Sequence, residues 1–197
     1  MSRSGEATRR RIIKCAYALF HRRGFSRVGI NEIAADAGVT KRSLYYHFKS
    51  KDHLLATVLE DQHELALASF QTWLHRLSGD AEKLIDTMFT ELANWSAKPR
   101  FAGSGFTRVA IELTDLPGHP GRAIARRHKA MLESLVAELF AGAGIPSPRA
   151  RAREIYVLLE GATALILVHG DRSYAVAAGE AAKILIRQKS PRRRAVR

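Results

Sequence analysis

The sequence has little of what builds disulfides, breaks helices or crosses membranes. Its 197 residues include a single cysteine, Cys15, which excludes an internal disulfide framework and favours a reducing, cytoplasmic location. No proline precedes Pro99, and strand-like alternation of apolar and polar residues is scarce, so helices are expected. No apolar run approaches the length of a membrane span, and the N-terminus lacks the apolar segment of a secretory signal.

The positive charge is concentrated at the two ends of the chain. The formal net charge is +13, and residues 1–53 carry twelve Lys or Arg against four acidic residues. Residues 187–197 add six positive charges and no acid, whereas residues 54–186 are close to neutral. A protein that is basic throughout would not need this division, so the charge indicates a nucleic-acid partner at the N-terminal end. The tail, residues 189–197, is too charged to pack, and we expect it to be disordered.

Apolar residues repeat at helical spacing along most of the chain, which predicts an all-α fold. The spacing and the Gly and Pro breaks predict helices at about 6–23, 30–37, 41–48, 51–77, 81–97, 106–113, 121–141, 149–169 and 173–188. The last two of these helices are apolar on nearly all sides. A helix of that kind has to be buried on more than one side, which predicts an interface with a second copy of the chain.

Residues 30–51 hold two short helical patterns separated by a glycine. The buried face of the first pattern consists of Ile30, Ile33, Ala34 and Ala37. Gly38 ends it because glycine adopts the left-handed turn without a Cβ penalty, and Thr40 is the expected N-cap of the second. Leu44 and Phe48 form the buried side of that second helix. Its outward side consists of Lys41, Arg42, Ser43, Tyr45, Tyr46 and His47. This arrangement is typical of a helix-turn-helix, whose second helix enters the major groove.

Residues 8–55 resemble the N-terminal domain of TetR-family transcriptional regulators. The matching residues are Ile12, Ala16, Phe20, Gly24, Phe25, Ile33, Ala34, Ala37, Gly38, Val39, Leu44, Tyr45, Tyr46, His47, Phe48, Lys51, Leu54 and Leu55. Gly29 departs from the family pattern, in which a Ser or Thr caps the helix and contacts phosphate. Arg42 replaces a residue that is frequently glycine or another small one. The rest of the chain resembles the family only in its all-helical layout.

The resemblance implies a DNA-binding domain at residues 1–53, with the helix-turn-helix at about 29–48. It also implies a helical effector-binding and dimerisation domain at residues 54–188, followed by the basic tail. The expected function is that of a homodimeric, ligand-responsive regulator, a repressor that a small molecule releases from double-stranded operator DNA. Base edges are expected to be contacted by Lys41, Arg42, Ser43 and Tyr45, and phosphates by Thr40, Tyr46, His47 and Lys51.

Aromatic residues concentrate in the middle of the chain, where the family would place an effector cavity. Each of them alone is more typical of a core, but apolar linings are usual for small-molecule sites. A largely apolar or aromatic effector is therefore favoured, and Arg108, Arg126 and Arg127 leave room for one that bears a carboxylate. The expected effector-binding residues are Phe70, Trp73, Phe89, Leu92, Trp95 and Phe106. The expected dimer interface consists of Leu158, Ala162, Leu165, Tyr174, Ala178, Ala181 and Leu185.

No catalytic, cofactor-binding or metal-binding motif is recognisable, so neither an enzyme, a cofactor nor a metal is expected. Glu60, His63 and Glu64 share a helix face at a spacing compatible with metal ligation, but such a trio is more often a solvated face. Cys15 lies next to the buried stripe of the first helix and is interpreted as a small core residue rather than a redox sensor. Two alternatives remain: a sequence-independent nucleic-acid binder, and a ligand-binding protein whose DNA-binding domain is vestigial.

Overall fold

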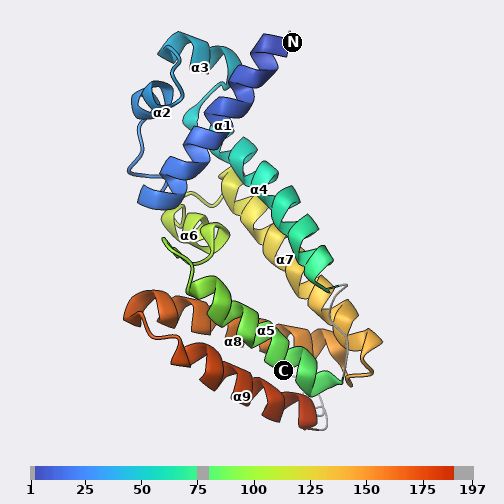
Figure 1. Cartoon of the computed structure of the whole chain (residues 1–197). Coiled ribbons are helices and arrows are strands. Elements are labelled where there is room, and N and C mark those ends of the chain that lie inside the picture. The colour runs from blue at the N-terminus through green and yellow to red at the C-terminus, as the bar shows by residue number, and fades with distance from the viewer. Residues whose placement is uncertain (1–2, 75–79, 189–197) are drawn as a thin grey trace. The chain divides into compact units, whose positions relative to one another are not determined.

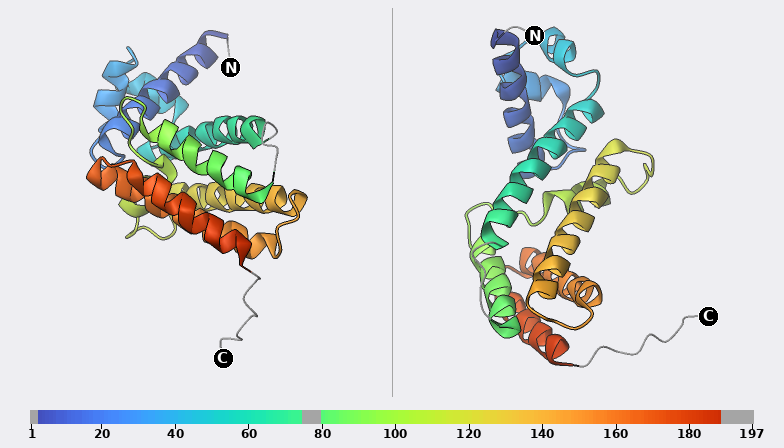
Figure 2. Two further views of the ribbon diagram at one scale, coloured as in Figure 1. Left: turned by 60° about the horizontal axis from the view of Figure 1, so that its bottom comes forward. Right: turned by 90° about the vertical axis from the view of Figure 1, so that its right-hand side faces the viewer.

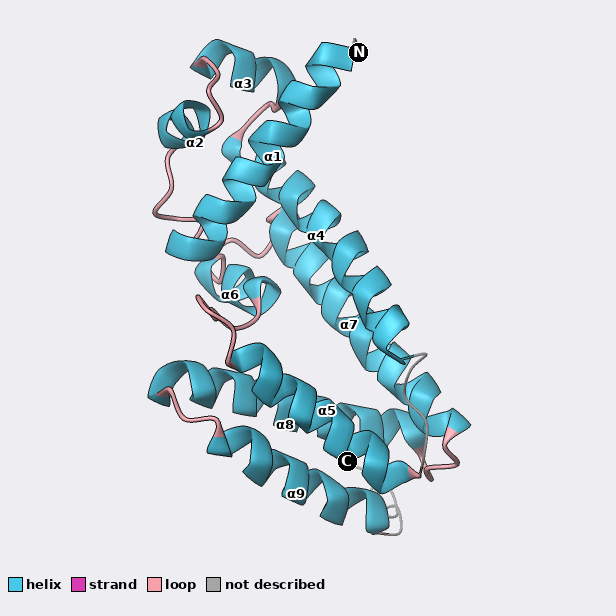
Figure 3. Cartoon of the chain, viewed as in Figure 1, coloured by secondary structure: helices cyan, strands magenta, loops and turns pink. Residues whose placement is uncertain are grey.

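The structure is a computed structural model of the whole chain, and it describes residues 3–74 and 80–188 (Figure 1). The described residues form nine α-helices and no strand, which confirms the all-α prediction (Figure 3). The helices are α1 Arg3–Arg23, α2 Ile30–Asp36, α3 Lys41–His47, α4 Lys51–Leu74, α5 Ala81–Ser96, α6 Gly105–Glu112, α7 Pro120–Gly142, α8 Pro148–His169 and α9 Ser173–Arg187. The predicted extension of α4 to residue 77 and the predicted disorder of residues 189–197 lie outside the described residues.

The chain divides into two compact units by its internal contacts. The first unit comprises Met1–Ala68 and Ser104–Lys129, and the second comprises Ser69–Gly103 and Ala130–Arg197. The helices α4 and α7 therefore contribute residues to both units. The predicted boundary after residue 53 divides the chain by function and stays a prediction. In the part of the chain that the structure describes, no helix is long and apolar enough to cross a bilayer.

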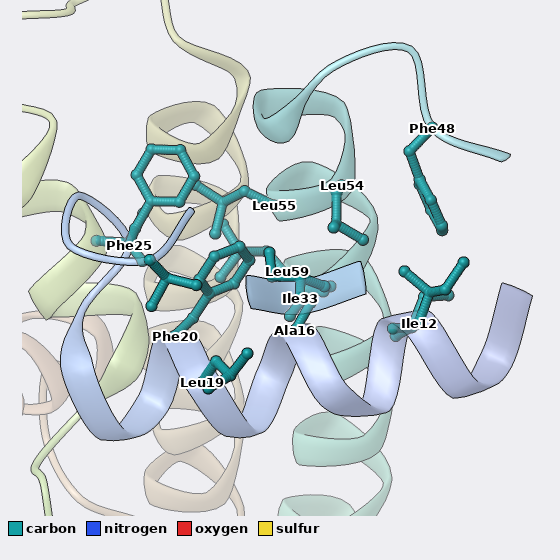
Figure 4. Packing of buried hydrophobic residues seen from close by; sticks show 14 of the residues in the cluster. Ile12, Ala16, Leu19, Phe20, Phe25, Ile33, Phe48, Leu54, Leu55 and Leu59 are labelled. Atoms are coloured by element: carbon teal, nitrogen blue, oxygen red, sulfur yellow. The ribbon is translucent and has the colours of Figure 1, made fainter. Parts of the chain in front are cut away.

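The core of the first unit is built around α1. Ile12, Ala16, Leu19 and Phe20 follow the buried side of α1 and lie against Ile33 of α2 and the leucines of α4, as Figure 4 shows. The same core includes Phe106, Val109 and Leu113 of α6 and Ile124 and Ala125 of α7. Each large apolar side chain removed from water stabilises the fold by about 1.5–3 kcal/mol. This shared core fixes α6 against the three helices of the helix-turn-helix domain.

The second unit is a layer of helices formed by α5, α8, α9 and the C-terminal part of α7. The helices α8 and α9 pack on each other, and α5 packs on both, as the views of Figures 1 and 2 agree. Ile85, Met88 and Phe89 of α5 are buried against Ile155 of α8 and Ala182 of α9. Gly179 allows the close approach of α9 to α5, because a Cβ there would lie 3.1 Å from the Cβ of Phe89.

Candidate nucleic-acid interface

The turn between α2 and α3 has the geometry that the sequence predicts for a helix-turn-helix. Gly38 is left-handed, with φ +60°, and the N–H of Val39 donates to the carbonyl of Ala34 at 2.9 Å. A residue with a Cβ would be strained at this φ, so the glycine is needed for its backbone rather than for space. Thr40 then caps α3, since its Oγ1 accepts a hydrogen bond from the N–H of Ser43 at 3.1 Å. Both the glycine stop and the threonine cap are confirmed.

Two fully buried side chains set the rotation of α3. Leu44 and Phe48 lie in the core of the first unit, one helical turn apart, and the opposite side of α3 is left to solvent. Tyr46 is 80% exposed and Tyr45 45% exposed, although both are large aromatic residues. Lys41, Arg42 and Thr40 are also exposed, whereas Ser43 and His47 are half-buried. The predicted DNA-binding residues of α3 therefore form one accessible surface of cations, hydroxyls and aromatic rings.

Lys51 differs from the other predicted DNA-binding residues. It begins α4, it is half-buried, and its Nζ lies 4.2 Å from the centre of the Phe25 ring. Burial lowers the pKa of Lys51, against the opposing effects of Asp52 and Glu112. The ammonium of Lys51 thus has a cation–π partner within its own domain. Its contact with phosphate stays a prediction.

Two arginines of α1 support the interface, and the sequence did not single them out. The Nε of Arg11 donates to the carbonyl of Ala37 at 2.7 Å, where it satisfies a backbone acceptor at the C-terminal end of α2. The guanidinium of Arg9 lies 5.3 Å from the centre of the Phe48 ring. In the sequence these residues belong to the cationic run of residues 9–11, a pattern that does not identify their partners. These contacts tie α1 to the turn of the helix-turn-helix and to the C-terminal end of α3.

The N-terminal end of α2 has no side-chain cap. Gly29 occupies the N-cap position with φ −90° and ψ 153°, which are ordinary extended values that any residue adopts. A Cβ added to Gly29 would meet no atom of the described residues within 4 Å. Gly29 therefore leaves α2 without the side-chain cap of the family pattern, although there is space for a side chain at this position.

The predicted effector-binding residues divide between the two cores. Phe89 and Leu92 are buried in the core of the second unit, and Phe70 and Trp73 pack against that core with their rings 5.2 Å apart. Trp95, at the end of α5, is exposed. Phe106 belongs to the core of the first unit, where its ring stacks on His128 at 3.7 Å. The structure thus places five of the six residues in one unit and Phe106 in the other, and their effector-binding role stays a prediction.

Most of the predicted dimer residues lie on the sides of α8 and α9 that face the core of the second unit. Ala162 is buried, Leu165 is exposed, and the remaining five, Leu158, Tyr174, Ala178, Ala181 and Leu185, are half-buried. The most exposed large apolar residues of these helices are others, which lie on the sides of the helices that face solvent. They are Val157, Leu167, Val168, Val176 and Ile184. Helical spacing in the sequence shows that α8 and α9 are apolar all round, but it does not show which row faces the rest of the chain.

The trio with metal-ligand spacing does not converge. His63 is buried and shares a hydrogen bond with His128, Glu60 pairs with Arg127, and Glu64 is exposed. The described residues contain no group of three or more His, Cys, Asp or Glu that could hold a metal ion. Cys15 packs against the core of the first unit, and burial, together with Asp36, raises the pKa of its thiol. A thiol that stays protonated is a poor nucleophile, which favours the core interpretation.

Known proteins match both the N-terminal segment and the whole fold. Residues 12–58 match the family model described as bacterial regulatory proteins, tetR family. The chain is 36% identical over 91 residues to the HTH-type transcriptional regulator TtgR of Pseudomonas putida, a match that covers 44% of this chain and 43% of TtgR. It is 34% identical over 82 residues to the HTH-type transcriptional repressor KstR2 of Mycolicibacterium smegmatis, over 41% of this chain and 40% of KstR2. The matched segment thus spans less than half of either protein.

Solved structures extend the likeness beyond that segment. SCO4454, a TetR-family transcriptional regulator from Streptomyces coelicolor, superposes with a TM-score of 0.80 at 26% identity, over 91% of this chain and 94% of that protein. A TetR transcriptional regulator from Chloroflexus aurantiacus superposes with a TM-score of 0.80 at 23% identity, over 95% and 98% of the two chains. The second likeness concerns the fold alone, because the identity is low.

Proposed function

Because this chain belongs to the TetR family of bacterial regulatory proteins, we propose that it is a ligand-responsive repressor that binds operator DNA as a homodimer. Members of this family are DNA-binding regulators and not enzymes. The observation that carries the proposal is the accessible surface of α3, whose rotation is set by the buried Leu44 and Phe48. The name of KstR2 supports repression as the direction of the effect.

The side chains of α3 suit both base and phosphate recognition. Arg42 and Lys41, in the first turn of α3, are the donors that favour guanine O6 and N7, and Ser43 and Tyr45 add hydroxyl groups. Thr40, Tyr46, His47 and Lys51 are proposed to contact phosphates, which fix the register of the helix on the duplex. We assign sequence preference to Arg42 above all, because its long fork can reach two acceptors of one base.

Dimerisation is proposed to use α8 and α9. Val168 is 73% exposed and Ile184 55% exposed, which leaves apolar side chains of the second unit in water in a single chain. Burial of such rows against the same rows of a second copy gives a symmetric interface, in which each residue contacts its counterpart's neighbours. A dimer would place two recognition helices in successive major grooves, about 34–36 Å apart.

The effector is proposed to be a small apolar or aromatic molecule that binds the helical region after residue 53. Phe70, Trp73 and Trp95 supply aromatic surface that is not fully buried, which supports an apolar ligand. Differential binding of such a ligand to two conformations typically changes DNA affinity by a coupling free energy of ~1–3 kcal/mol. The basic residues 189–197 are proposed to add affinity for any DNA through counterion release.

The test is the selection of bound fragments from genomic DNA with the purified protein, followed by footprinting. A regulator should enrich a few fragments that share an inverted repeat, and a footprint should cover both half-sites. A sequence-independent binder would enrich no fragment, and its affinity would depend on salt alone. A protein with a vestigial DNA-binding domain would retain no fragment. Either of these two results would contradict the proposed function.

A further inference from the structure

Two charged residues of α6 contact the backbone where α1 ends and the next loop begins. Arg108 and Glu112 lie one helical turn apart, and the Nε of Arg108 donates to Oε1 of Glu112 at 3.0 Å. The Nη1 of Arg108 also donates to the carbonyl of His21 at 3.1 Å, and the N–H of Ser26 donates to Oε2 of Glu112 at 2.9 Å. Figure 1 shows α6 beside this end of α1. One ion pair of α6 thus binds two backbone groups that lie far from α6 in the sequence.

Neither backbone group has an intrahelical partner: the carbonyl of His21 lies at the end of α1, and the N–H of Ser26 lies in a loop. The carbonyl of His21 is among the last four of α1, which have no intrahelical donor. A cation there also interacts favourably with the negative end of the helix dipole. Ser26 lies in the loop of residues 24–29, where the N–H of Val28 donates to the carbonyl of Phe25 at 3.3 Å. Glu112 therefore fixes the loop that leads directly into α2.

Gly24 makes the approach of the ion pair to the backbone sterically possible. Its φ is +88°, a value that favours glycine, and a Cβ there would lie 2.6 Å from Oε1 of Glu112. The same Cβ would lie 2.9 Å from Nη2 of Arg108. The backbone of the loop and the charged side chains of α6 are thus in direct contact, without an intervening side chain or space for one.

The loop adjoins both ends of the α2–α3 segment that contains the recognition helix. At its end, Gly29 gives α2 no side-chain cap, so the start of α2 is defined by the loop that precedes it. Near its start, the ring of Phe25 is buried and lies 4.2 Å from the ammonium of Lys51, the first residue after the turn that follows α3. Both ends of the α2–α3 segment therefore depend on a loop that α6 holds in place.

We propose that Arg108 and Glu112 are positioning residues for DNA recognition: they fix the 24–29 loop from α6 and so replace the local cap that α2 lacks at Gly29. They act through the backbone of the loop and not through contact with DNA. The proposal rests on the proposed function for its DNA readout. Its structural part, which is that Glu112 stabilises the N-terminal end of α2, can be measured without DNA.

The test compares Glu112→Gln with Glu60→Gln in the full-length protein. Both variants lose one negative charge of the first unit, and Glu60 pairs with the exposed Arg127 of α7 rather than with the loop. Hydrogen–deuterium exchange of the amides of residues 25–33 should be faster in Glu112→Gln and unchanged in Glu60→Gln. Affinity for a duplex obtained by genomic selection, measured well below the melting temperature, should fall by about tenfold only in Glu112→Gln.

A double variant distinguishes positioning from a general loss of stability. Gly29→Ser gives α2 a local cap, so its gain in DNA affinity should be larger in the Glu112→Gln background than in the wild type. Equal gains in both backgrounds, or wild-type exchange of residues 25–33 in Glu112→Gln, would overturn the proposal. So would a lower melting temperature without any change in affinity. If the wild type binds no duplex, the proposed function fails, and the exchange measurement still decides the dependence of α2 on Glu112.

Discussion

His63 of α4 and His128 of α7 are both buried and share one hydrogen bond, with their Nδ1 atoms 2.9 Å apart. One Nδ1 has to donate and the other to accept, so the two rings cannot both be protonated while the bond persists. Burial, reinforced by His63 and Lys129, lowers the pKa of His128 from 6.5 to about 4. The ring of Phe106 stacks on the His128 ring, with 3.7 Å between the ring centres.

The lowered pKa of His128 predicts a loss of stability in mild acid. Below pH 6.5 the unfolded chain binds a proton at this residue and the folded chain does not, until the pH approaches about 4. Stability from the neutral ring is therefore complete above pH 6.5 and falls as the pH drops, by about 2 kcal/mol between pH 7 and pH 5. Urea unfolding at both pH values measures it. His128→Asn should remove most of this pH dependence, and replacement of the exposed His169 should not. An unchanged slope in His128→Asn would contradict the assignment.

Gly179 is predicted to be intolerant of a side chain. A Cβ there would lie 3.1 Å from the Cβ and 3.3 Å from the Cγ of Phe89, and both residues sit on helices of a packed core. Gly179→Ala should therefore destabilise the protein by about 1–3 kcal/mol in denaturant unfolding, despite the better helix propensity of alanine. Gly142→Ala is the control, because a Cβ at this helical position meets no described atom within 4 Å. The account would be wrong if both substitutions stabilised the protein.

Gly29→Ser is predicted to stabilise the protein by a few tenths of a kcal/mol, because a serine at the N-cap of α2 can accept an N–H from its first turn. The backbone is already extended and, among the described atoms, none lies within 4 Å of the new Cβ, so no rearrangement is needed. Gly118→Ser serves as the control, since Gly118 lies in an open loop that caps no helix. Equal changes in melting temperature for the two variants would show that the cap does not form.

An exposed apolar residue of α9 is predicted to be needed for dimerisation. Val176 is 64% exposed, so Val176→Asp should leave the folded chain intact while it places two carboxylates in the proposed interface. Sedimentation at micromolar concentration should give a dimer for the wild type and a monomer for the variant, together with weaker DNA binding. Leu116→Asp is a matched control in the loop between α6 and α7, where the apolar residue is 54% exposed. A monomeric wild type would refute the interface.

The helices and their ends were predictable because they depend on local chemistry. The spacing of Ile12, Ala16 and Phe20 sets the buried side of α1, and Gly38 and Thr40 set the turn through their own backbone and side-chain preferences. The rotation of α3 followed in the same way from Leu44 and Phe48. Each of these features is decided within a few residues of sequence, and the resemblance to a known family added the expectation of DNA binding.

The contacts that were missed join residues far apart in the chain. The ammonium of Lys51 lies over Phe25, a position that its place at the start of α4 does not reveal. The sequence places Phe106 among the other aromatic residues in the middle of the chain, but it belongs to the core of the first unit with α1 and α4. On α8 and α9 apolar residues occur on all sides of the helix. The sequence therefore does not show which of them pack into the core of the same chain and which are exposed. Tertiary packing decides all three.

Lys51 and Arg42 are predicted to differ in what they contribute to DNA binding. Lys51→Ala should weaken binding to all sequences by similar factors and lower the salt dependence, because a phosphate contact releases counterions. Titrations of operator and random duplexes at several salt concentrations measure both effects. A loss confined to the operator would show that Lys51 takes part in base recognition.

The most direct measurement is the affinity of the wild type and of Arg42→Ala for a selected operator and for a duplex of scrambled sequence. If α3 reads bases, the wild type should prefer the operator by a large factor. Arg42→Ala should lose about 1–3 kcal/mol on the operator, lose far less on the scrambled duplex, and relax the preference at one base pair. Equal affinity of the wild type for both duplexes, or an Arg42→Ala variant that binds the operator as tightly as the wild type, would contradict the proposed recognition surface.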